Sequence, residues 1–95
     1  MIKVSVFYPN GEGASFDHDY YKESHVPLAA KSWGLDRWQI EKGVDGPYLA
    51  AVHFEFPSVE AFQSAMASET TAAVMADIPN YTNTQPVVQV SEIVI

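Results

Sequence analysis

Polar and hydrophobic residues alternate along four segments of the chain, and two further segments carry apolar residues at helical spacing. Alternation over residues 2–8, 35–42, 48–56 and 87–95 predicts four β-strands. Residues 18–33 predict a helix with Asp17 as its N-cap and Gly34 as its stop, and Pro27 predicts a kink or break inside it. Ser58 is a plausible N-cap for a second helix, and residues 69–77 predict a shorter one.

The order of these elements indicates a single domain over residues 1–95. Strand, helix, strand, strand, helix, short helix and strand form two βαβ halves, the pattern of a ferredoxin-like α+β fold with an antiparallel four-stranded sheet. In residues 48–56 both faces of the predicted strand are partly apolar, and helices cover only one face of such a sheet. We therefore expect the second face to pack against another copy, which gives a homodimer with a barrel interior.

Composition narrows the range of partners. The chain has 5 basic and 12 acidic residues and a formal net charge of −7, so it would repel nucleic acid and anionic membranes. It has no cysteine, which excludes disulfides and thiol chemistry. No apolar run approaches membrane-spanning length and the first residues read as a strand, so we expect a soluble cytoplasmic protein without a membrane partner.

The strongest candidate for chemistry is His25. On a helix Tyr21, His25 and Leu28 share one face, which should look toward the sheet. Histidine titrates near neutral pH, so His25 and Tyr21 form a candidate acid–base pair for proton abstraction from an activated carbon or protonation of an enolate. The alternative is a core histidine that hydrogen-bonds to a backbone carbonyl, for example one left free by Pro27.

Other polar and aromatic residues are candidates for binding a ligand. His53 lies mid-strand with Glu55 on the same face, and it is interpreted either as a second cavity-lining group or as a cross-strand contact. Trp38 is either a core or interface aromatic or the wall of a pocket. Polar residues of an irregular segment before the last strand either line a pocket mouth or make turns; they are Asp77, Asn80 and Tyr81. The histidines lack metal-ligand spacing, so neither a metal nor a cofactor is expected.

Several motifs resemble the EthD family of dimeric α+β barrel proteins. They are Tyr8-Pro9-Asn10-Gly11, Asp19-Tyr20-Tyr21 with His25-Val26-Pro27-Leu28, Asp77-Ile78-Pro79-Asn80-Tyr81-Thr82, and the closing Gln85-Pro86-Val87-Val88. The resemblance implies a ferredoxin-like fold and a homodimer formed by sheet-to-sheet packing. The family takes its name from a pathway that degrades ethyl tert-butyl ether. Wider relatives on this barrel include cofactor-independent monooxygenases, cyclases and isomerases, so the fold does not select a reaction.

These observations lead to one functional hypothesis and two rivals. The first is an apolar pocket between the sheet and the helix of His25, which acts on a small apolar oxygenated molecule such as a phenol, quinone or enolisable ketone. His25 would be the general base or acid, Tyr21 its partner or an oxyanion donor, and His53 a second polar contact. The first rival is a non-catalytic accessory or carrier protein that supports an oxygenase pathway. In the second, His25 is only structural.

Overall fold

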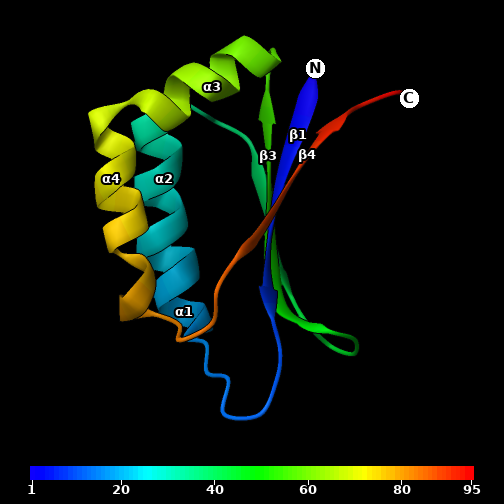
Figure 1. The fold of residues 1–95 in the computed structure, drawn as a ribbon, viewed down its shortest axis with the longest axis vertical. Helices are drawn as coiled ribbons and strands as arrows, with labels where there is room; N and C mark the ends of the chain where they lie inside the picture. The colour runs from blue at the N-terminus through cyan, green and yellow to red at the C-terminus, as the bar shows by residue number, and fades with distance from the viewer.

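A four-stranded sheet covered on one face by helices makes up the computed structural model, which describes residues 1–95 (Figure 1). The strands are β1 (Ile2–Pro9), β2 (Trp38–Lys42), β3 (Tyr48–Phe56) and β4 (Val87–Glu92). Their order in the sheet is β2-β3-β1-β4, and every neighbouring pair is antiparallel. The predicted ferredoxin-like α+β fold is confirmed. The second strand is shorter than predicted and starts at Trp38, and the last ends at Glu92.

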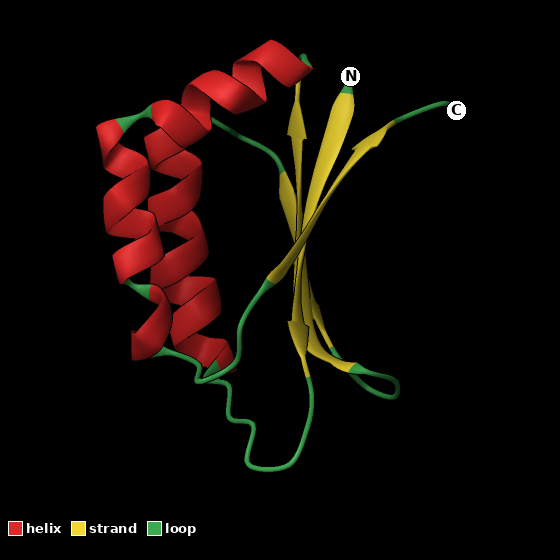
Figure 2. Ribbon diagram, in the orientation of Figure 1, coloured by secondary structure: helices red, strands yellow, loops and turns green.

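The helices lie in one layer, and the opposite face of the sheet is uncovered (Figure 2). They are α1 (His18–Tyr20), a π-helical segment (Tyr21–His25), α2 (Val26–Trp33), α3 (Val59–Ala67), α4 (Glu69–Ala76) and a 3₁₀ turn (Ile78–Asn80). Both predicted N-caps are present. Asp17 accepts a hydrogen bond from the Tyr20 amide at 3.0 Å, and Ser58 accepts one from the Ala61 amide at 3.1 Å. None of the helices has the length and apolar character needed to cross a bilayer.

The first helical run is continuous, so Pro27 does not break it, and a wide turn precedes the proline. The Val26 amide donates to the Tyr21 carbonyl, which is the five-residue step of a π-helix. Pro27 has no amide hydrogen for the Glu23 carbonyl, and its ring would press on that carbonyl in a regular α-helix. Widening the turn relieves this contact, so the helix continues to Trp33.

The π-turn decides which side chains face the sheet. In a regular α-helix Lys22 would lie one turn below the fully buried Val26, because residues four apart share a face. The extra residue rotates the preceding segment by about 100°, one residue's step in an α-helix, and puts Tyr21 there instead of Lys22. His25, four residues before the buried Ala29, faces the sheet in either geometry. Tyr21 and His25 are 1% and 5% exposed. Leu28 is 37% exposed, so the prediction that it shares their face is wrong; the buried residues of α2 are Val26, Ala29 and Ala30.

The core lies between this helical layer and the covered face of the sheet. Cross-strand register places Val4, Phe54 and Val90 side by side on that face, and Val6, Val52 and Val88 in the next row. The predicted alternation is confirmed from Ala50 onward, because Ala50, Val52, Phe54 and Phe56 are each 2% exposed. Tyr48 was expected on the same face, but the register shifts between Tyr8 and Pro9 and its ring packs against Phe7 on the other face.

Replacing Phe54 by alanine tests this account of the core. The ring is 2% exposed and meets Trp33 edge to face at a centroid distance of 5.3 Å. Phe54→Ala should lower the free energy of unfolding by about 3–5 kcal/mol, because it leaves a cavity in a packed layer. Urea unfolding at one fixed protein concentration measures it. Glu55→Ala, on the opposite and exposed face, should change the value by less than about 0.5 kcal/mol. Equal losses in the two variants would contradict this picture.

Candidate active site

A small cavity lies between the helical layer and the covered face of the sheet. Its volume is about 70 Å³. Three residues with polar groups, Tyr8, Tyr21 and His25, contribute to its wall. The remaining lining is apolar and comes from both layers: Val6, Val26, Trp33, Val52, Phe54, Val74, Met75, Ile78, Pro86 and Val88. The cavity therefore has the mostly apolar wall with a few convergent polar groups that is typical of small-molecule sites.

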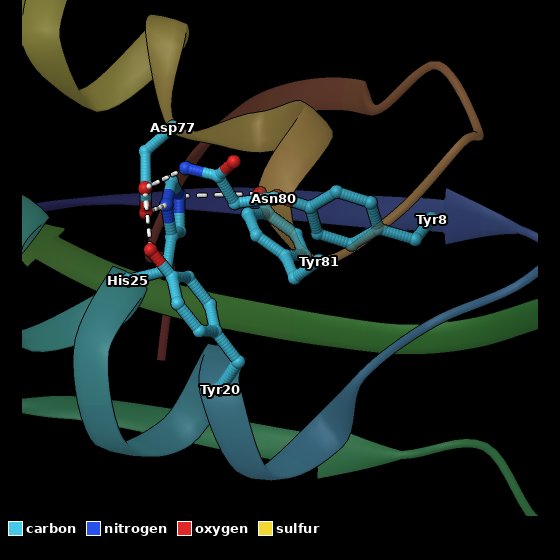
Figure 3. A network of polar contacts seen from close by, with 6 residues as sticks. All are labelled: Tyr8, Tyr20, His25, Asp77, Asn80 and Tyr81. Atoms are coloured by element: carbon cyan, nitrogen blue, oxygen red, sulfur yellow. Dashed lines mark hydrogen bonds and ion pairs between the residues drawn. The ribbon is translucent and has the colours of Figure 1, made fainter.

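His25 is held at both ring nitrogens by side chains from the segment that follows α4 (Figure 3). Its Nδ1 lies 2.9 Å from Asp77 Oδ2, and its Nε2 lies 3.2 Å from the Tyr81 hydroxyl. A core histidine bonded to a backbone carbonyl was the alternative expected from the sequence. The structure instead gives the ring two side-chain partners, one acidic and one phenolic.

Asp77 collects three hydrogen bonds, which fix its orientation. Besides His25, the Tyr20 hydroxyl donates to Oδ1 at 2.7 Å and the Asn80 amide donates to the same oxygen at 2.9 Å (Figure 3). Asp77 follows the last residue of α4, and Asn80 ends the 3₁₀ turn, so this short segment presents both side chains to the helix of His25. An acceptor-only carboxylate with three donors holds its neighbours in defined directions.

The protonation states follow from burial and these contacts. Burial lowers the pKa of His25 below its ordinary value more strongly than Asp77 raises it, so the imidazole is neutral near neutral pH. Burial raises the pKa of Asp77, but hydrogen bonds from Tyr20, Asn80 and His25 outweigh it, and the net pKa is lowered. Asp77 is thus a carboxylate and must accept the Nδ1 hydrogen. The neutral ring then presents Nε2 as an acceptor to Tyr81.

Tyrosine hydroxyls continue the network toward the cavity. The Tyr8 and Tyr81 oxygens are 2.6 Å apart, and both side chains are buried. The ring of Tyr21 stacks on His25 at a centroid distance of 5.5 Å and an interplanar angle of 15°. Its buried hydroxyl has no hydrogen-bond partner in the chain. Burial raises the pKa of Tyr21 and of Tyr81 far above the usual range, so both phenols keep their protons.

Sequence reasoning located part of this site. The structure brings Asp77, Asn80 and Tyr81 together around His25, although these three residues do not line the cavity. Tyr21 lies against His25 through its ring, and no hydrogen bond joins the two side chains. Tyr8 and Tyr20 were not predicted. One feature of the sequence could have indicated Tyr8: alternation places its hydroxyl on the same strand face as the apolar Val4 and Val6.

His53 and Trp38 do not belong to this cavity. His53 projects from the uncovered face of β3, where the Ser5 Oγ lies 2.7 Å from its Nδ1 and the Glu41 Oε1 lies 2.8 Å from its Nε2. Trp38 lies with His53 beside an open groove at the edge of the sheet. The interpretation of His53 as a second group in the His25 cavity is wrong, because alternate strand residues point to opposite faces. The alternative, a cross-strand contact, is what the structure has.

The Ser5, His53 and Glu41 contacts have the order of a hydrolytic triad but not its surroundings. Ser5 is 5% exposed and lies mid-strand, paired with His53 on one side and Gln89 on the other. Both flanking ladders use the backbone amides, so no pair of free N–H groups can stabilise an oxyanion beside Ser5. This row is best described as a polar cross-strand cluster.

Fold and site together define a small ferredoxin-like α+β protein, of the dimeric α+β barrel class of folds, with a histidine and two tyrosines in the wall of an apolar cavity. A family model described as the EthD domain matches residues 10–85. The chain belongs to the EthD family, and the resemblance noted from its motifs is confirmed.

Solved structures support this assignment. An EthD-like protein from Ralstonia eutropha is 40% identical, with a TM-score of 0.91 over 99% of this chain and 92% of the other. An ethyl tert-butyl ether degradation (EthD) family protein from Bacillus halodurans is 20% identical, with a TM-score of 0.76 over 98% of each chain. SnoaB, a cofactor-independent oxygenase from Streptomyces nogalater, shares the fold at 13% identity, with a TM-score of 0.69 over 99% of this chain and 92% of that protein. No curated protein sequence shows significant similarity to the chain.

The depressed pKa of His25 predicts how stability depends on pH. The folded pKa lies below the ordinary value of 6.5, so between these two values the unfolded chain binds a proton that the folded chain does not. The free energy of unfolding should therefore fall as pH decreases through this window. The lowered pKa of Asp77 causes a second decrease in the free energy of unfolding, as pH falls from the ordinary pKa of 3.8 toward the pKa of Asp77 in the folded chain.

Urea unfolding at about pH 7.5 and about pH 5.5 measures the first loss. His25→Gln should reduce the difference in the free energy of unfolding between the two pH values. The same pH dependence in His25→Gln and in the unsubstituted protein would contradict the assignment to His25.

Proposed function

We propose that this EthD-family protein moves a proton at the carbon beside a carbonyl group, interconverting keto and enol forms of a small neutral molecule. The observation that carries the proposal is a neutral histidine in the wall of a mostly apolar cavity, held by a carboxylate at Nδ1 and a phenol at Nε2. A neutral imidazole oriented by a carboxylate has the basicity and fixed direction that general acid–base catalysis needs.

The size of the cavity favours one of the ligand classes expected from the sequence. A cavity of about 150 Å³ is known to admit a benzene ring, and the space here is about 70 Å³. Phenols and quinones are therefore too large unless the wall opens, whereas a ketone or aldehyde of a few heavy atoms is closer to the available room. Half-exposed Met75 and Val88 lie where the wall meets solvent, so the opening is expected there.

The lining also favours a neutral ligand. No lysine or arginine contributes to the wall, and the chain carries a net charge of −7, so a carboxylate or phosphate group would be desolvated without a counter-charge. The unpartnered Tyr21 hydroxyl is a donor that a carbonyl oxygen can satisfy. Such a bond would stabilise an enolate oxygen as charge develops on it.

A carrier or accessory role is the second candidate function. Both ring nitrogens of His25 are already satisfied within the chain, an arrangement that suits a structural or ligand-orienting histidine as well as a base. In this case the cavity would hold a pathway intermediate without converting it.

Deuterium exchange distinguishes enzyme from carrier. Butanone in D₂O should lose its methylene proton signals faster with the protein than without it, as followed by NMR, and it should raise the melting temperature in a concentration-dependent way. His25→Gln should lower the exchange rate by about 10²-fold or more. His53→Gln, a matched change outside the cavity, should not. Saturable binding without exchange would refute catalysis on this ketone and support the carrier role.

We also propose that the uncovered face of the sheet packs against a second copy of the chain. Phe7 and Tyr48 form an aromatic pair on that face, with ring centroids 5.0 Å apart. Val87, opposite Phe7 in the neighbouring strand, is 48% exposed. A single helical layer leaves this apolar row in water, and a second sheet would cover it.

Sedimentation tests the assembly. The chain should sediment as a dimer of about twice its 10.5 kDa mass at micromolar concentration. Phe7→Glu should shift it toward the monomer, because two carboxylates would then meet across the interface, and Glu60→Gln, on helix α3 in the other layer, should not. A monomer for the unsubstituted chain would contradict the proposal.

A further inference from the structure

The hydrogen bonds around His25 can be assigned a single direction. Asp77 is a carboxylate, so the Nδ1 hydrogen of His25 points to it and Nε2 of the neutral ring accepts. The Tyr81 hydroxyl, 3.2 Å away, must donate to Nε2. With its hydrogen used there, Tyr81 accepts from the Tyr8 hydroxyl at 2.6 Å. The chain of donors therefore runs from Tyr8 through Tyr81 and His25 to Asp77 (Figure 3).

Of the four residues in this series of hydrogen bonds, Tyr8 and His25 line the cavity, and Tyr81 and Asp77 do not. Tyr81 occupies Nε2 of His25, so a ligand cannot contact that nitrogen unless it displaces the phenol. Tyr81 does not line the cavity, whereas Tyr8 does. After donating to Tyr81, the Tyr8 oxygen retains an acceptor lone pair.

We propose that Tyr8 is the catalytic residue that touches the substrate, and that His25 acts on it through Tyr81. This inference rests on the proposed proton-transfer function and assigns the contact with the reacting carbon to a phenol oxygen in place of an imidazole nitrogen. Its basis is geometric: the cavity wall holds Tyr8, and two short contacts connect Tyr8 to His25.

The proposed step balances without any further reagent. The Tyr8 oxygen takes the proton from the carbon beside the carbonyl, while its own hydrogen passes to the Tyr81 oxygen and the Tyr81 hydrogen passes to Nε2 of His25. The C–H electron pair becomes the enolate, whose oxygen accepts a hydrogen bond from Tyr21. His25 becomes an imidazolium paired with Asp77, and both phenols end neutral. The reverse sequence returns a proton to carbon, and in D₂O this returns deuterium.

Removing the Tyr8 hydroxyl while keeping its ring gives the direct test. Tyr8→Phe should lower butanone exchange by about 10²-fold or more, because the connection between the carbon and His25 is cut. Its affinity for butanone, from the melting-temperature shift, should change less than about threefold, since Tyr21 supplies the bond to the carbonyl. Tyr81→Phe cuts the same route at its middle and should give the same split between rate and affinity.

Tyr20→Phe is the matched control. It removes a phenol hydroxyl that also belongs to the network, 2.7 Å from Asp77, but Tyr20 does not line the cavity. Its exchange rate should fall by less than about tenfold. Circular dichroism checks that each variant is folded, and if Tyr8→Phe is not, Tyr81→Phe decides.

The exchange rates of these variants distinguish a failure of the relay through Tyr8 from a failure of the proposed proton-transfer function. The unsubstituted protein is expected to catalyse exchange. If the exchange rate of Tyr8→Phe or of folded Tyr81→Phe is within threefold of that rate, the relay is overturned and His25 is a direct base. A loss as large in Tyr20→Phe as in Tyr8→Phe also overturns it, because the hydroxyls would then act only through the fold. No exchange by the unsubstituted protein refutes the proposed function itself.

Discussion

The bond between His25 and Asp77 is the constraint on which the site depends. It joins the first helical run to the segment after α4, two parts of the chain 52 residues apart. Because the carboxylate can only accept, it fixes the tautomer of the ring, and the tautomer fixes the direction of every hydrogen bond beyond it. A buried histidine with a different partner, such as a backbone amide, would reverse those directions and leave Tyr81 as an acceptor.

Much of the fold could be predicted from the sequence because its signals are local. Alternation in residues 50–56, the caps at Asp17 and Ser58, and the stop at Gly34 each depend on a few neighbouring residues, and the structure confirms them. The ends of the second and last strands were less predictable, because pairing with a neighbouring strand decides where a strand stops.

The site was only partly predictable because its contacts are long-range. Motif and helix position pointed to His25, but helical periodicity gave no reason to pair it with Asp77 or Tyr81. Tyr8 lies 73 residues from Tyr81, and nothing in either local sequence indicates a bond between them. His53 was misplaced for a simpler reason: alternation puts it on one face of its strand with Glu55, but only the folded sheet shows which face the helix of His25 covers.

The π-turn of residues 21–25 has a consequence for comparing members of the family. With the turn present, Tyr21 lies one turn before Val26 on the same face. In a regular α-helix Lys22 would be there, and an ammonium group would enter an apolar layer. A single-residue gap in an alignment across this helix thus exchanges one set of cavity-facing side chains for another, even where every flanking residue is identical. The number of residues between Asp17 and Val26 therefore determines, together with the identity of the histidine, which side chains reach the cavity.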